Sequence, residues 1–133
     1  MLITMTPEFS NQFISHLPAD AVAENSTRQV QHAALSFVRP TPVLNPKLVL
    51  WSEETANLLS LSDDLKNNAD FMRVLAGNEV GQNSKPYATV YGGHQFGHWA
   101  GQLGDGRAIN LGELQSGDTL FSLQLKVAGP TPY

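Results

Sequence analysis

Glycine, histidine and arginine crowd into one part of this chain, the stretch 91–107 (YGGHQFGHWAGQLGDGR). Glycine lets the backbone take positive φ angles and approach a ligand closely, and successive N–H groups in a glycine turn can form a concave anion site. The alternative is that these glycines serve tight turns and bulges in a twisted sheet, and glycine content alone favours it. Seven of the eleven glycines lie in or just beyond this stretch, at positions 92, 93, 97, 101, 104, 106 and 112.

Two established phosphate-binding motifs fail here. The dinucleotide pattern G-x-G-x-x-G would need a glycine where Ile109 stands, and no Gly-Lys-Ser/Thr follows for a Walker loop. What remains is a glycine turn, a strand, a second turn and a strand that carries Lys126, 20 residues after Gly106. That order resembles the small lobe of a protein kinase, in which a glycine-rich loop covers the ATP phosphates and a strand lysine pairs with them.

The two cations beside this turn have two possible roles each. Arg107 follows the turn directly, and a guanidinium beside free N–H donors suits a phosphate. The commoner role would be a surface salt bridge, with Asp105 or Glu113 as the partner. Most strand lysines are simply solvated, and the apolar neighbours of Lys126 make a functional role equally plausible for it.

The two histidines of this stretch predict no metal site. His94 and His98 are four residues apart, which is a metal-ligand spacing on a helix, but the flanking glycines argue against a helix and no third ligand is nearby. Phe96 and Trp99 are expected in the core or in a pocket wall.

The second half of the chain predicts a mainly antiparallel sheet that positions these groups. Its segments are rich in β-branched and aromatic residues and are separated by turn residues. The expected strands are YATVY (87–91), GRAINLGEL (106–114) and TLFSLQLKV (119–127), with QSGD (115–118) as a turn.

Alternation along the last strand separates two faces. Ser122, Gln124 and Lys126 share a polar face. The opposite face is predicted to belong to the core and consists of Phe121, Leu123, Leu125 and Val127.

The first half predicts helices and an irregular arm. Ser52 is expected to cap a helix through ETANLLSL, a short helix opens at Asp63 or Asp64, and another covers 69–75 and ends at Gly77. Residues 1–46 are interrupted by prolines and predict an irregular arm. The side chains expected to anchor this arm against the core are Phe13, Ile14, Leu17, Leu35, Phe37 and Val38.

Composition excludes several classes of protein. The 133 residues are 41% hydrophobic and 15% charged, which suits one globular domain, and the net charge of −4 without a basic cluster argues against nucleic-acid binding. Without cysteine there is no disulfide, and the N-terminus carries neither a signal peptide nor a membrane span, so we expect no membrane contact and a cytoplasmic location. The apolar last strand suggests that the natural chain continues and covers it.

The motif residues closely resemble one family, selenoprotein O, also called the SelO or YdiU protein adenylyltransferases. The resemblance rests on YGGHQFGHWAGQLGDGRAINLGE and LQLKVAGPTPY, with support from SFVRPTPVLNPKLVLW and VLAGNEV, and it covers about residues 35–133. It implies a kinase-like fold that binds ATP in a flipped orientation and transfers AMP to protein hydroxyls. By resemblance, Gly104, Gly106 and Arg107 would contact the ATP phosphates, and Lys126 would take the strand-lysine role.

The resemblance also implies what lies outside this chain. The family's catalytic aspartate and its ligands for Mg²⁺ or Mn²⁺ come further downstream, so no catalytic or metal-binding residue is expected here. The resulting prediction is an incomplete α+β fold: an N-terminal arm (1–46) and part of a kinase-like N-lobe (47–133), with the catalytic C-lobe absent. The complete protein is expected to be a monomer that binds ATP and protein substrates with hydroxyl side chains. The alternative is a non-catalytic ATP-binding pseudokinase or scaffold module.

One position departs from the family pattern. The family usually carries a small residue, often glycine, after the strand lysine, and this chain carries Val127. The departure leaves the local geometry beside Lys126 open.

Overall fold

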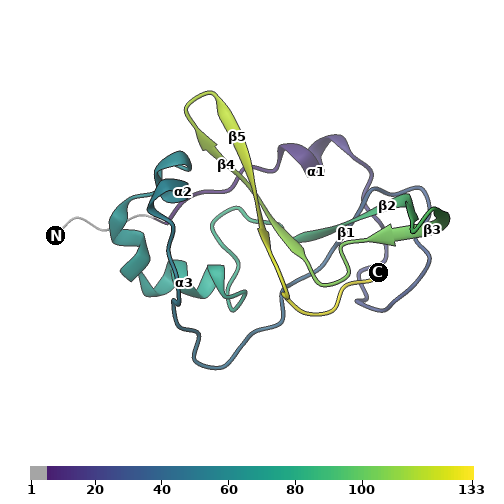
Figure 1. The fold of residues 1–133 in the computed structure, drawn as a ribbon, viewed down its shortest axis with the longest axis horizontal. Helices are drawn as coiled ribbons and strands as arrows, with labels where there is room; N and C mark the ends of the chain where they lie inside the picture. The colour runs from purple at the N-terminus through teal and green to yellow at the C-terminus, as the bar shows by residue number, and fades with distance from the viewer. Residues whose placement is uncertain (1–5) are drawn as a thin grey trace.

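The structure is a computed structural model that describes residues 6–133. A long hairpin of β4 (Ile109–Ser116) and β5 (Thr119–Leu125) crosses the middle of the molecule (Figure 1). Helices α2 and α3 lie on one side of this hairpin, and α1 lies on the other side together with the rest of the antiparallel sheet. The elements in chain order are α1 (Gln12–His16), β1 (Leu35–Phe37), α2 (Glu53–Leu58), η1 (Asp63–Asn67), α3 (Ala69–Leu75), β2 (Tyr87–Gln95), β3 (His98–Gly104), β4 (Ile109–Ser116) and β5 (Thr119–Leu125).

The sheet has the order β1-β2-β4-β5, and β3 pairs with β2 outside this path. Every strand pair is antiparallel. β2 connects the two parts of the sheet: its first half pairs with β1, its second half with β3, and Tyr87 pairs with Asn110 of β4. The predicted α+β class with an antiparallel sheet is confirmed, while its likeness to a kinase small lobe stays a prediction.

Helices α2 and α3 begin where the sequence predicts them, because side chains satisfy their first N–H groups. The side chain of Ser52 accepts a hydrogen bond from the Thr55 N–H, and that of Asn68 accepts one from the Phe71 N–H at 2.8 Å. Gly77 follows α3 with a φ of 77°, as expected for a residue that ends a helix.

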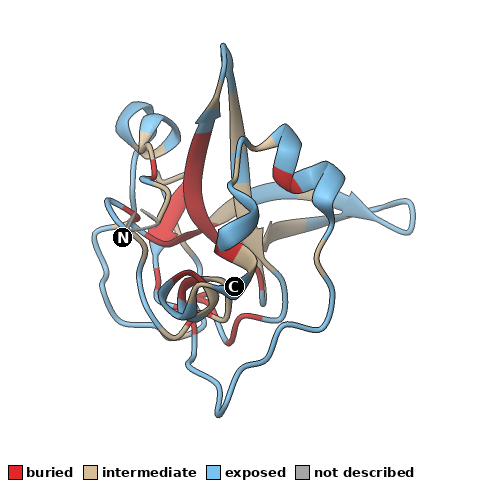
Figure 2. Cartoon of the chain, turned by 90° about the vertical axis from the view of Figure 1, so that its left-hand side faces the viewer, coloured by how far each residue is buried: buried red, intermediate tan, exposed pale blue. Residues whose placement is uncertain are grey.

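The core consists of two clusters that share strand β4. Figure 2 shows the buried residues of β4 as a continuous red band. Leu125 packs against both clusters and so joins them. The first cluster contains Phe9, Val74, Leu111 and Leu114, and the second contains Val38, Ala88, Ile109 and Ala128.

The strands in and around the glycine-rich stretch differ from the predicted ones. The strand expected over 87–91 continues to Gln95, and β3 returns along it, so the residues between the two expected strands form a hairpin. β5 ends at Leu125, one residue before Lys126. Val127 was predicted on the core face but is 79% exposed, because the chain leaves the strand before it.

The N-terminal arm is less irregular than expected, and residues 1–5 of it lie outside the described part. It contributes α1 to one face and β1 to the sheet. Leu35 and Val38 are buried and Ile14 is half-buried, as anchors should be. The prediction is wrong for Phe13, Leu17 and Phe37, which remain 38–44% exposed; the ring of Phe13 still stacks on that of Tyr87 at 5.3 Å.

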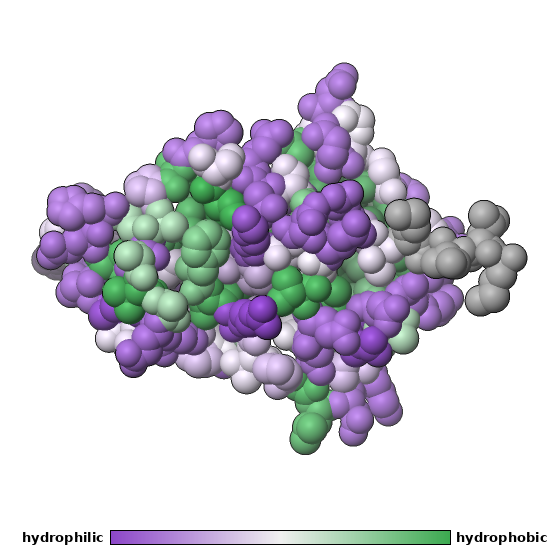
Figure 3. Space-filling model, turned by 180° about the vertical axis from the view of Figure 1, so that it is seen from behind, coloured by the Kyte–Doolittle hydropathy of each residue, from purple (hydrophilic) through white to green (hydrophobic). Residues whose placement is uncertain are grey.

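The outer surface mixes polar and apolar side chains. Apolar atoms project from the lower edge in Figure 3, at the place where Figure 1 shows the loop before α2. In that loop Leu44 and Val49 are each 95% exposed. Among residues 6–133, helices are too short or too polar to span a lipid bilayer.

Candidate functional site: a glycine turn beside Lys126

The turn 104–107 joins β3 to β4 and is held by one aspartate. Oδ2 of Asp105 accepts hydrogen bonds from the Thr89 N–H at 2.9 Å and from the Thr89 hydroxyl at 2.7 Å. The Asp105 N–H donates back to the Thr89 carbonyl at 2.9 Å. From the other side, the Thr131 hydroxyl contacts the carbonyls of Asp105 at 2.7 Å and Gly106 at 3.0 Å. The turn is therefore fixed to β2 and to the segment after β5.

The two glycines of this turn have different surroundings. A Cβ atom on Gly104 would lie 2.6 Å from a ring carbon of Tyr133, so glycine is needed there for packing. At Gly106 the nearest atom to such a Cβ is the Tyr133 carbonyl oxygen at 3.8 Å, so a side chain would not clash there. Within residues 6–133, the N–H groups of Gly106 and Arg107 donate to no backbone acceptor. Two successive free N–H groups can serve an anion.

The structure brings Arg107 and Lys126 onto facing segments. Ile109 pairs with Leu125 at the end of the β4–β5 ladder, and just beyond it the Ala128 N–H donates to the Arg107 carbonyl at 2.8 Å. Both side chains are exposed. Both residues lie just beyond the last pair of this ladder, Arg107 within the glycine turn and Lys126 after the end of β5.

Neither acidic residue considered as a salt-bridge partner for Arg107 takes that role in the described part of the chain. Oδ2 of Asp105 is engaged by neutral donors, and Glu113 is buried, with one carboxylate oxygen accepting from the Gln12 N–H at 3.0 Å. The guanidinium of Arg107 therefore remains available to an anionic ligand.

Val127, the departure from the family pattern, has an unusual backbone conformation. Its φ is +56°, in the left-handed region that β-branched residues rarely adopt. A glycine would take this conformation without strain. The small residue that the family usually carries therefore falls at a position where the backbone favours it, next to Lys126.

The sequence did not predict a hydrogen-bond network that joins Tyr133 to the N-terminal arm. The Tyr133 hydroxyl donates to Ser36 Oγ at 2.7 Å, Ser36 Oγ donates to Asp20 Oδ2 at 3.0 Å, and Arg28 Nη2 reaches the same oxygen at 2.5 Å. The Val22 N–H and the Arg28 guanidinium lower the pKa of Asp20 below its ordinary value. Burial raises the pKa of Tyr133. The hydrogen-bonded partners Ser36 and Tyr133 lie 97 positions apart in sequence, so no local motif marks this network.

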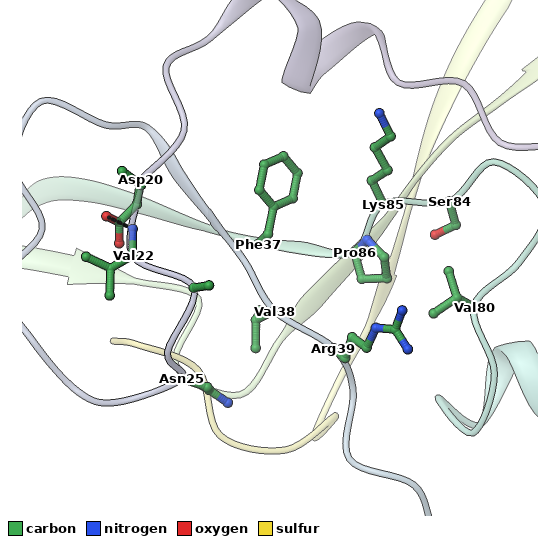
Figure 4. Close-up of a pocket in the computed structure, with 12 residues that line it drawn as sticks. Asp20, Val22, Asn25, Phe37, Val38, Arg39, Val80, Ser84, Lys85 and Pro86 are labelled. Atoms are coloured by element: carbon green, nitrogen blue, oxygen red, sulfur yellow. Dashed lines mark hydrogen bonds between the residues drawn. The ribbon is translucent and has the colours of Figure 1, made fainter.

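One cavity lies away from the glycine turn. It has a volume of about 700 Å³ and opens between the arm, β1 and the loop before β2 (Figure 4). Neither Arg107 nor Lys126 lines it. Another cavity, of about 490 Å³, adjoins Gly104 and Tyr133, and Arg107 and Lys126 do not line this one either. The side chains around the larger cavity include Val22, Phe37, Val38, Arg39, Lys85 and Pro86.

In the β2–β3 hairpin, which precedes the turn 104–107, His94 lies on β2 and His98 on β3. His94 pairs with Trp99, and their rings meet edge to face at 5.1 Å. No group of three potential metal ligands occurs in residues 6–133. Trp99 lines a cavity of about 350 Å³ but is 64% exposed, so it is not part of the core. The prediction for Phe96 is wrong, because its side chain at the hairpin tip is fully exposed.

Comparison with known proteins assigns the family. The family model described as protein adenylyltransferase SelO matches residues 20–133, and the chain therefore belongs to this family. The matched range includes the glycine turn and the strand end with Lys126.

Similar proteins are named protein nucleotidyltransferase YdiU. The one from Flavobacterium johnsoniae is 51% identical over 126 residues, which cover 95% of this chain and 24% of that protein. The one from Rhodopirellula baltica is 52% identical over 132 residues, covering 98% and 24%. The one from Nitrosospira multiformis is 50% identical over 126 residues, covering 94% and 22%. The chain thus spans about a quarter of the length of these relatives.

Proposed function

We propose that the whole protein to which this chain belongs transfers AMP from ATP to Ser, Thr or Tyr hydroxyls of other proteins. The family description and the names of the relatives support a nucleotidyltransferase. Because the chain spans about a quarter of those relatives, the proposal concerns the longer protein, and we expect this chain by itself to be inactive.

One observation carries the proposal for this chain's residues. The open position at Gly106, two N–H groups without a backbone acceptor and the side chain of Arg107 lie beside the strand end that bears Lys126. Such nitrogen donors suit a triphosphate, which carries several negative charges on a chain of oxygens. The role of Gly104 is different, since its lack of a Cβ makes room for Tyr133.

The proposed reaction is a substitution at the α-phosphorus. The hydroxyl oxygen of the substrate forms a bond to this phosphorus, the bond to the oxygen that bridges the α- and β-phosphates breaks, and pyrophosphate leaves. The substrate proton passes to a base, for which we propose an aspartate downstream of residue 133. Arg107 and Lys126 would bind and orient the triphosphate and offset its charge, and such positioning and charge stabilisation are the main means of catalysis in this chemistry.

The divalent cation that such a reaction uses has no donor set among residues 6–133, because no three potential ligand side chains gather there. We propose that its ligands, like the base, lie in the rest of the protein. When bound, Mg²⁺ or Mn²⁺ would neutralise phosphate charge. The absence of cysteine supports a reducing compartment such as the cytoplasm, and we expect a monomer.

The decisive experiment supplies the full-length protein with ATP labelled separately at the α- and γ-phosphates, together with a protein mixture. Label from the α-position alone on proteins is expected. Label from the γ-position alone would identify a kinase instead, and ATP binding without any transfer would identify a non-catalytic module.

Two variants test the assigned roles. Lys126→Ala and Arg107→Ala each remove a charge-assisted hydrogen bond of about 1.5–3 kcal/mol, so transfer should fall about ten- to hundredfold while the protein still folds. Lys47→Ala removes an exposed lysine remote in sequence from the turn and serves as the control. Undiminished transfer in Lys126→Ala would refute its role.

A further inference from the structure

A row of polar side chains crosses the sheet beneath the glycine turn. Asp105 Oδ2 accepts from the hydroxyl and the N–H of Thr89 and also from Asn110 Nδ2 at 3.1 Å. Asn110 Oδ1 in turn accepts from Gln124 Nε2 at 3.1 Å. We call Thr89, Asp105, Asn110 and Gln124 the polar row. It links residues of β2, the turn, β4 and β5.

The polar row ends close to the lysine. Gln124 precedes Lys126 by two residues, and Asn110 stands opposite Gln124 in the β4–β5 ladder. The amide of Asn110 also donates to the Tyr87 carbonyl at 3.2 Å, which fixes its orientation. The turn and the strand end that bears Lys126 are therefore tied to each other through side chains as well as through the backbone.

All three hydrogen bonds to the Asp105 carboxylate end on one oxygen, Oδ2, and all three donors are neutral. A neutral side chain with an oxygen in the same place could accept the same bonds. The negative charge of Asp105 is therefore not needed for the contacts, and beside a bound triphosphate it would be unfavourable.

We propose that Asp105 is a positioning residue for ATP, which acts through hydrogen bonds from the polar row and not through its charge. This inference rests on the function proposed above. Asp105 holds the turn so that the N–H groups of Gly106 and Arg107 are in place before the nucleotide arrives. Order that exists before binding raises affinity, because less conformational freedom is lost on binding.

The experiment uses the full-length protein and compares Asp105→Ala with Asp105→Asn. The alanine removes the acceptor, and KM for ATP and the Kd for ATP are expected to rise about tenfold or more. The asparagine places its carbonyl oxygen where Oδ2 lies, and both constants should stay within about twofold of the wild type. Equal impairment of the two variants would overturn the proposal, because it would show that the charge is what matters. Wild-type constants for Asp105→Ala would also overturn it.

A milder pair keeps the test informative if Asp105→Ala does not fold. Thr89→Val removes the hydroxyl that donates to Asp105 and keeps nearly the same side-chain shape. Thr119→Val makes the same change at the exposed start of β5 and is the matched control. KM for ATP should rise about three- to fivefold in the first and not in the second, with kcat and KM for the protein substrate unchanged in both. An unchanged KM for ATP in Thr89→Val, or an equal rise in the control, would overturn the proposal.

Amide hydrogen exchange of the peptide that covers 104–108, measured without ATP, reports how well ordered the turn is before the nucleotide binds. Exchange should be faster in Asp105→Ala and in Thr89→Val but not in Asp105→Asn, and unchanged exchange in Asp105→Ala would overturn the proposal. The exchange rates and the Kd for ATP distinguish a failure of the proposed function from a failure of the role proposed for Asp105. A wild-type protein that binds ATP but transfers no AMP would refute the proposed function, while the exchange and Kd results would still decide the role of Asp105.

Discussion

Two glycine-rich segments of this chain lie next to each other in sequence and differ in structure. The turn 104–107 is held by side chains of β2 and β4 and by the segment after β5. The hairpin tip at Phe96 and Gly97 has both residues at positive φ, joins Gln95 to His98 and exposes the Phe96 side chain completely. Glycine content alone does not distinguish them.

The difference shows what distinguishes a candidate site from a sheet turn. At the hairpin tip, glycine serves a two-residue turn between strands, the explanation that glycine content favoured. At the turn 104–107, glycine is combined with a clamped backbone, N–H groups without backbone acceptors and two nearby cations. Four predictions can break or sharpen this comparison.

The largest effect is expected from alanine at Gly104. Its Cβ would meet three atoms of Tyr133 at 2.6–2.8 Å, and overpacking of this kind costs about 3 kcal/mol. Alanine at Gly97, where no atom lies within 4 Å and only the positive φ opposes it, should cost about 1 kcal/mol. Thermal melting of the full-length variants measures both. Equal losses would show that Tyr133 does not pack on the turn.

The next effect appears at alkaline pH. Burial, with smaller contributions from Glu113 and Asp105, raises the pKa of Tyr87 from the ordinary 10.0 to about 12. The folded state thus holds the Tyr87 proton more tightly than the unfolded chain does. The protonated hydroxyl therefore makes its full contribution to the free energy of unfolding below pH 10, and this contribution is lost as the pH rises through 12. Relative to Tyr87→Phe, wild-type stability should fall by about 1.4 kcal/mol per pH unit across that window. Parallel curves would show that Tyr87 is not buried.

A gain in stability is expected at Val127. Glycine there relieves a left-handed conformation but adds freedom to the unfolded chain, for a net gain of about 0.5–1 kcal/mol. Val127→Ala keeps a Cβ at the same φ of +56° and is the control, with no gain expected. A higher melting temperature in the alanine variant alone would contradict the strain at this position.

The smallest effect is expected at the hairpin tip. Phe96→Asn creates the Asn-Gly pair that two-residue hairpins prefer and should stabilise the protein by about 0.5 kcal/mol. AMP transfer should not change, since this side chain is fully exposed and contacts nothing in the turn 104–107. A marked change in transfer would remove the contrast between the two segments.

Local signals in the sequence predicted much of the fold. Ser52 caps α2, and α3 covers residues 69–75 as expected, because capping and helix formation depend on neighbours within a few positions. The alternation of β5 holds as far as Leu125. The strands β1 and β3 were missed, since a three-residue strand and a glycine-rich one are stabilised by their partner β2 and not by their own propensity.

The amino-acid sequence by itself determined the helices of residues 53–75, the class of the sheet, the family resemblance and the candidate residues Gly106, Arg107 and Lys126. Only the tertiary structure decided that Gly104 accommodates Tyr133, that Val127 leaves the core face and that Asp105 clamps the turn. The physical reason is that each of these depends on a contact between side chains or backbones brought together by folding. Asp105, for example, meets Thr89 across 16 positions and Thr131 across 26, distances at which sequence spacing indicates no geometry.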